Sequence, residues 1–112
     1  MTDNRIRLLI MAVVQEQDLD PAMRALEPLE TVVVYFASAG GFLGRRNATL
    51  LIGLPEGKEQ SVLDALQIVC RQRIEYMTLP LEGSPMPMPA PVPVTVGGAT
   101  VFALPVERFE EI

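Results

Sequence analysis

The sequence predicts an α+β domain of the ferredoxin-like type. Two observations predict this class. β-branched and aromatic runs alternate with two helical patterns, and their order is β-α-β, a loop, β-α-β and two further β runs. That βαββαβ order produces one sheet with both helices on the same face. The length of 112 residues fits a single domain, residues 1–112. We therefore expect a two-layer sandwich with an extra terminal β-hairpin.

The expected strands are short runs rich in Val, Ile, Leu, Tyr and Phe. They cover residues 5–14, 31–36, 48–54, 74–81, 92–96 and 99–105. Gly97 and Gly98 separate the last two runs, and two glycines between β runs are typical of a tight hairpin turn. These two runs therefore form the predicted terminal hairpin.

Two helices are predicted from apolar side chains at helical spacing. In the first, Pro21 falls near the first turn, and the apolar face is formed by Ala22, Leu26 and Leu29. The second covers residues 59–73, and its apolar face follows Val62, Leu66, Val69 and Arg73. Cys70 lies on the apolar side of this helix, which predicts a buried and unreactive thiol.

Composition narrows the classes of function. Apolar residues make up 49% of the chain, more than a lone domain of this size hides easily, which favours a homo-oligomer. A net charge of −5 argues against nucleic acids and anionic membranes as partners. The chain has no histidine and one cysteine, which removes the commonest acid–base, nucleophilic and metal-binding arrangements. We expect a cytoplasmic protein that is not an enzyme and carries neither cofactor nor metal.

The loop after the second predicted strand is the most unusual stretch. Its two glycines permit close approach of the backbone to another molecule. Its phenylalanine is large enough to stack on a base. Its two arginines add local positive charge to a chain that is acidic overall. Asn47 carries the paired donor and acceptor that match an adenine edge. The stretch comprises Gly40, Gly41, Phe42, Leu43, Gly44, Arg45, Arg46 and Asn47. A plain β-turn with solvated arginines is the alternative interpretation.

Residues 84–94 hold proline at every second position, with Met86 and Met88 between. Proline donates no backbone hydrogen bond, so this segment is not a central strand and favours an extended, polyproline-like path. It is either a stiff connector or a flap over a ligand or a neighbouring subunit.

Three spaced motifs give the chain a resemblance to a known family. They are residues 12–18 (AVVQEQD), residues 40–43 (GGFL) followed by Asn47, and residues 96–102 (VGGATVF) with Pro105 and Val106. In this order they resemble the PII-like cyclic di-AMP receptor family, also called PstA or DarA. The resemblance runs from about residue 8 to residue 112.

The resemblance implies a homotrimer with three ligand sites between neighbouring subunits, and loops that rearrange on binding to signal to an unknown downstream protein. Gly40, Gly41, Phe42 and Leu43 would lie against a base, ribose or phosphate, and Phe102 would pack on the ligand. Asn47 would read an adenine edge with help from the backbone of Gly53.

The chain departs from the family pattern in its loop and at three further positions. The loop reads Gly44-Arg45-Arg46 where the family more often has a single basic residue and a glycine before Asn47, and Arg45 and Arg46 are expected to compensate for lost base contacts by pairing with phosphates. Val32 and Val34 stand where the family often has an arginine and a threonine that contact adenine, and Glu111 stands in place of a glutamine. A sensor of another adenine nucleotide is therefore a second hypothesis. A ligand-free trimeric adaptor, which contacts its partner through the Pro–Met segment, is a third.

Overall fold

The computed structural model describes residues 6–37, 46–79 and 90–112. In chain order its elements are β1 (Leu8–Gln15), the 3-10 turn η1 (Glu16–Asp18), α1 (Leu19–Leu26), β2 (Val32–Ala37), β3 (Asn47–Leu54), α2 (Glu59–Cys70), β4 (Arg73–Leu79), β5 (Ala90–Val96) and β6 (Ala99–Pro105). The predicted loop residues Gly40, Gly41, Phe42, Leu43 and Arg45 lie outside the described residues, as do Met86 and Met88.

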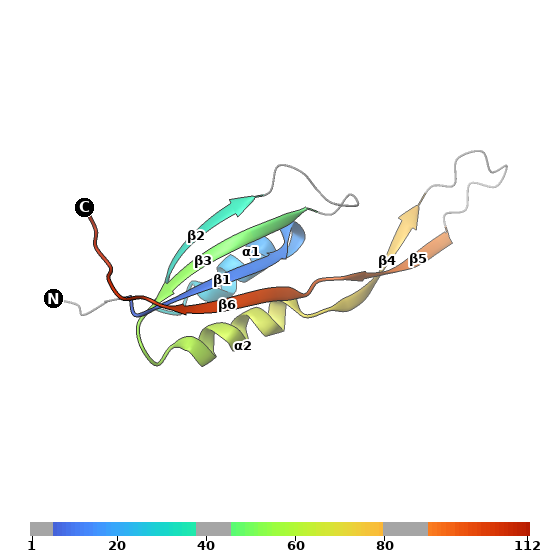
Figure 1. Ribbon diagram of the computed structural model, residues 1–112. Helices are drawn as coiled ribbons and strands as arrows, with labels where there is room; N and C mark the ends of the chain where they lie inside the picture. Colours follow the sequence, from blue (N-terminus) through green and yellow to red (C-terminus); the bar gives the residue numbers. More distant parts are fainter. Residues whose placement is uncertain (1–5, 38–45, 80–89) are drawn as a thin grey trace.

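The main sheet is antiparallel, with strand order β2-β3-β1-β6. Both helices cover one face of it, as Figure 1 shows. Alternate residues of the two central strands point to that face and are completely buried, among them Ile10, Leu50 and Ile52. Val62 and Leu66 of α2 and Leu26 of α1 close the core from the helical side. The predicted α+β sandwich, with an antiparallel sheet and two helices, is confirmed.

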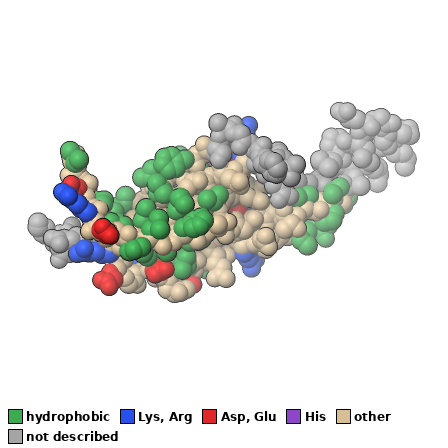
Figure 2. Space-filling model, viewed as in Figure 1, with side chains coloured by type: hydrophobic (Ala, Val, Ile, Leu, Met, Phe, Trp, Pro, Cys, Tyr) green, Lys and Arg blue, Asp and Glu red, His purple; other side chains and the backbone are tan. Residues whose placement is uncertain are grey.

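Neither of the described helices lies on the other face of the sheet (Figure 1). By register it presents Val32, Val34 and Phe36 of β2, and Phe102 and Leu104 of β6. These five side chains are 48% to 57% exposed. Figure 2 shows hydrophobic side chains gathered over the strands. We call this surface the open face; it is largely apolar.

The predicted terminal hairpin is wrong. Strand β6 does not pair with β5 but with β1, in a ladder that runs from Val14–Ala99 to Leu8–Pro105. Strand β5 pairs with β4 as a separate two-stranded ribbon that extends away from the sheet (Figure 1). Pairing with β1 is favoured because it brings Val101 against the core, which a hairpin with β5 does not do.

Proline explains why β5 is placed in the ribbon. Pro91 and Pro93 are two residues apart, so their missing N–H groups fall on the same edge of the strand. In a two-stranded ribbon that edge can face away from β4 without losing a ladder bond. Gly97 and Gly98, with φ of 85° and 94°, form the connection between ribbon and sheet instead of a hairpin turn.

Helix α2 is shorter than predicted. It ends at Cys70, and Arg71 is already extended, with φ −57° and ψ 149°. Arg73, which the helical spacing placed on the apolar face of α2, is the first residue of β4. Helix α1 is also shorter than predicted. It ends at Leu26, two residues before Pro28, and does not reach Leu29.

Candidate functional site

Four of the predicted site residues are described: Arg46, Asn47, Gly53 and Phe102. Arg46 is exposed and directly precedes β3, and its carbonyl oxygen accepts a hydrogen bond from the N–H of Glu16 at 2.9 Å. Asn47 is the first residue of β3 and is exposed opposite Gln15, the last residue of β1. The two predicted polar residues therefore lie at the end of the sheet where β1 finishes and β3 begins.

Register places Asn47, Gly53 and Phe102 on the open face. Phe102 lies in β6 opposite Met11, and half of its surface is exposed. Asn47 and Gly53 lie at opposite ends of β3, roughly 20 Å apart at the usual rise of a strand. One subunit alone therefore does not bring Asn47 and Gly53 together around one base.

Gly53 has a packing role within the chain. It is buried, and it lies between Leu9 of β1 and Val32 of β2 in the sheet. A Cβ at this position would be 2.6 Å from Cδ1 of Ile6, so the missing side chain makes room for Ile6. This contact accounts for a glycine in the strand without any ligand.

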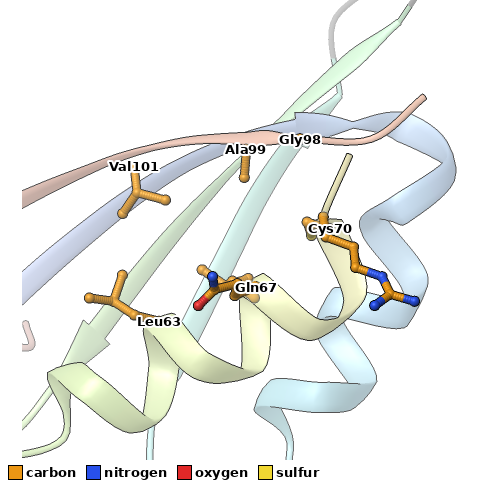
Figure 3. Close-up of a pocket in the computed structure, with 8 residues that line it drawn as sticks. Leu63, Gln67, Cys70, Gly98, Ala99 and Val101 are labelled. Atoms are coloured by element: carbon orange, nitrogen blue, oxygen red, sulfur yellow. The ribbon is translucent and has the colours of Figure 1, made fainter. Parts of the chain in front are cut away.

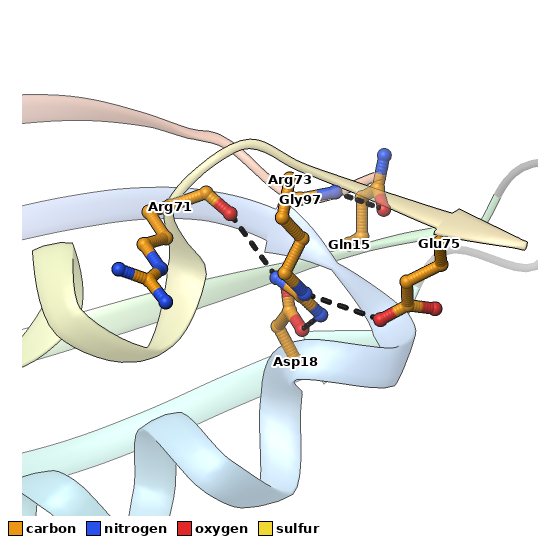
Figure 4. Close-up of polar contacts among 6 residues, drawn as sticks. All are labelled: Gln15, Asp18, Arg71, Arg73, Glu75 and Gly97. Carbon is orange, nitrogen blue, oxygen red and sulfur yellow. Dashed lines mark hydrogen bonds and ion pairs between the residues drawn. The ribbon is translucent and has the colours of Figure 1, made fainter. Parts of the chain in front are cut away.

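A polar junction lies where the ribbon leaves the sheet, as Figure 4 shows. The guanidinium of Arg73 donates to both carboxylate oxygens of Asp18, at 2.7 Å and 3.4 Å, and also to the carbonyl oxygen of Arg71. Glu75 accepts a further bond from Nε of Arg73 at 3.1 Å. The backbone N–H of Gly97 donates to the side-chain oxygen of Gln15 at 2.8 Å.

Asp18 is 2% exposed, so its charge depends on Arg73 for compensation. The hydrogen bond to Asp18 is the largest cause of a raised pKa for Arg73, which stays cationic. Asp18 belongs to the motif at residues 12–18, but this ion pair was not predicted from the sequence. The two partners are 55 residues apart, and no local spacing connects them.

Cys70 is buried, as predicted. Burial is the main cause that raises the pKa of its thiol to about 11, and the negative charge of Asp18 adds to the effect. The thiol lines a pocket of about 270 Å³ between α2 and β6 (Figure 3). Mostly apolar groups surround this pocket, including Leu63, Leu66 and Val101, and no predicted site residue does.

The described part of the chain holds no group of three acidic or cysteine side chains that could bind a metal ion. Of the helices that the structure describes, none has the length and apolar character needed to cross a bilayer.

The comparison with protein families is decisive for the class of protein. A family model described as "Cyclic-di-AMP receptor" matches residues 7–112. The chain belongs to this cyclic-di-AMP receptor family. The resemblance read from the three sequence motifs is thereby confirmed, and the family is one of binding proteins.

Solved structures support the same fold. A functionally unknown protein from Pediococcus pentosaceus is 31% identical, with a TM-score of 0.75 over 96% of this chain and 98% of that chain. A DUF3240 family protein from Shewanella baltica is 15% identical, with a TM-score of 0.59 over the same shares of the two chains. This second similarity concerns the fold alone.

Proposed function

We propose that this chain is a receptor that binds cyclic di-AMP in clefts between the subunits of a homotrimer, and that its loops rearrange on binding and signal to a partner protein. The observation that carries the proposal is the open face of the sheet. It joins a large uncovered apolar surface to candidate ligand-binding residues at its end. Membership of the cyclic-di-AMP receptor family supports the choice of ligand.

The exposure of the open face supports assembly. Monomeric proteins seldom expose a continuous apolar surface of this kind, and such surfaces mark places where another molecule packs. A cleft bounded by two open faces also resolves the separation of Asn47 and Gly53, since the two ends of β3 can belong to two subunits at one site. Gly53 then contacts ligand only through its backbone.

The side chains suit a dinucleotide. Phe102 offers a half-exposed ring for stacking on adenine. Asn47 offers the amide that pairs with an adenine edge. The positive charge of Arg46 lies beside Asn47, where it can meet a phosphate even though the chain as a whole is acidic.

A sensor of another adenine nucleotide remains a second candidate. The observation that favours it is the position of Val32 and Val34, whose side chains lie on the open face and are more than half exposed. They offer no hydrogen bond where the receptor family often has an arginine and a threonine. Discrimination among nucleotides would then depend on Asn47 and on the loop before it.

Calorimetry with cyclic di-AMP tests the proposal. We expect about one site per subunit in the wild-type protein. Replacement Asn47→Ala should weaken binding roughly tenfold through the loss of hydrogen bonds. Phe102→Ala should weaken it about five- to hundredfold through the loss of stacking. Ser61→Ala, an exposed change on α2, is the matched control and should bind like the wild type.

Two results would count against the proposal. One is an absence of heat or thermal stabilisation with cyclic di-AMP. The other is unaltered affinity in both Asn47→Ala and Phe102→Ala. Stronger thermal stabilisation by ATP or AMP than by cyclic di-AMP would select the second candidate.

A further inference from the structure

The β4–β5 ribbon needs its attachment to the sheet. An isolated two-stranded ribbon is marginally stable at best in water, so its order depends on what holds its base. Among the described residues, three polar contacts hold it: the ion pair of Arg73 with Asp18, the bond from the N–H of Gly98 to the carbonyl of Cys70, and the bond from the N–H of Gly97 to Gln15. Of these, only the last uses a side chain from the sheet.

Gln15 also lies directly beside the candidate ligand site. It is the cross-strand partner of Asn47 in the last pair of the β1–β3 ladder. Opposite residues in an antiparallel pair have Cβ atoms about 5 Å apart and point to the same face. The next residue, Glu16, donates its backbone N–H to Arg46. A ligand held by Asn47 and Arg46 therefore acts on the short segment that holds the ribbon.

We propose that Gln15 is a positioning residue that couples ligand occupancy at Asn47 to the order of the β4–β5 ribbon. This inference rests on the proposed function. Ligand contacts at Asn47 constrain the neighbouring Gln15 side chain, and Gln15 constrains the Gly97 amide. Gly97 is the pivot, because its φ of 85° is a conformation that glycine adopts without strain. Coupling is reciprocal, so an ordered ribbon also favours ligand binding.

Hydrogen exchange of the Gly97 amide, followed by NMR in the full-length protein, tests the anchor without ligand. Gln15→Ala removes the acceptor, and we expect Gly97 to exchange roughly two- to tenfold faster than in the wild type. Gln15→Glu keeps a side-chain oxygen at the same distance along the side chain and should restore protection. Gln17→Ala, in the 3-10 turn that follows Gln15 and without a described bond to the ribbon, is the matched control and should leave exchange unchanged.

The same measurement with saturating cyclic di-AMP tests the coupling. In the wild type, ligand should slow the exchange of Gly97 by about threefold or more. In Gln15→Ala the ligand should still bind, with a dissociation constant raised by up to about tenfold, but it should no longer slow that exchange. Gln15→Glu should regain the response.

The outcomes separate this inference from the proposed function. Unchanged exchange in ligand-free Gln15→Ala would overturn the anchor. A full ligand response of Gly97 in Gln15→Ala would overturn the coupling and leave the receptor function in place. A wild-type protein that does not bind cyclic di-AMP would overturn the proposed function and the coupling together, while the ligand-free comparison would still decide the anchor.

Discussion

At the scale of single residues, the pKa of the Cys70 thiol depends on the polar residues where the ribbon leaves the sheet. Its helical position predicted burial, and the structure places it at the end of α2, next to the buried Asp18–Arg73 pair. The pKa of Cys70 is raised from the ordinary 9.0 to about 11; desolvation is the largest cause, and the charge of Asp18 raises the pKa by more than the charge of Arg73 lowers it. The neutral thiol is therefore the form that the folded state favours.

This pKa predicts how stability depends on pH. The folded pKa is raised above the unfolded one, so the contribution of Cys70 is complete below pH 9 and is lost as pH rises towards 11. We expect a loss of about 2 kcal/mol in the free energy of unfolding over this interval. Urea unfolding at a fixed protein concentration measures it. Cys70→Ala should show a shallower decline, because it lacks the thiol and is otherwise the same chain; identical slopes would contradict the prediction.

At the scale of elements, the connection between β5 and β6 decides the topology. Its two glycines were interpreted as a hairpin turn, whereas they join the ribbon to the sheet. Gly97 has a positive φ, and a Cβ there would collide with the carbonyl oxygen of Arg71 and approach Nη1 of Arg73 at 2.7 Å. The glycine is therefore required both for its backbone conformation and for the close approach of β4.

Two glycines of positive φ give a matched comparison. Gly57→Ala places a Cβ in open space and should cost about 1–2 kcal/mol of stability from backbone strain alone. Gly97→Ala adds a collision with backbone and should cost about 2 kcal/mol more. Denaturant unfolding of both variants measures the difference. Equal losses of stability in the two variants would contradict this prediction, because the atoms around Gly97 would then move aside without cost.

At the scale of the whole molecule, the apolar composition finds its explanation in the open face. The helices cover only one side of the sheet, and the other side keeps Val34, Phe36 and Leu104 about half exposed. None of the four strands of the main sheet, β1, β2, β3 and β6, contains a charged residue. This distribution is expected of a subunit whose open face packs against other copies.

Assembly through the open face predicts a mass of three times the 12.3 kDa chain in light scattering. Val34→Asp puts a charge on that face and should reduce the mass to that of one subunit, because an unpaired buried charge is costly. Ile68→Asp is the control, since Ile68 is exposed on α2, away from the sheet. A monomeric wild type, or an intact trimer with Val34→Asp, would contradict this arrangement.

The sequence by itself determined the elements and the family. Apolar runs over residues 5–14 and 48–54 and helical spacing from residue 59 predicted two central strands and a helix, and three motifs in order identified the receptor family. The tertiary structure alone decided which strands pair. Local patterns do not show whether β5 or β6 pairs with β1. That choice depends on the packing of Val101 against core residues that are distant in the sequence.

The candidate site likewise has a part that the sequence predicted and a part that only the tertiary structure showed. Asn47 and Phe102 belong to the sequence motifs, and Gly53 followed from the family resemblance. Their common face and the distance between the ends of β3 follow only from strand register. The junction of Gln15, Asp18, Arg73 and Gly97 was not predictable, since each residue looks ordinary within its own segment. Folding brings them together because a buried carboxylate and a partly buried amide each gain from a partner, and the chain supplies those partners from far along its length.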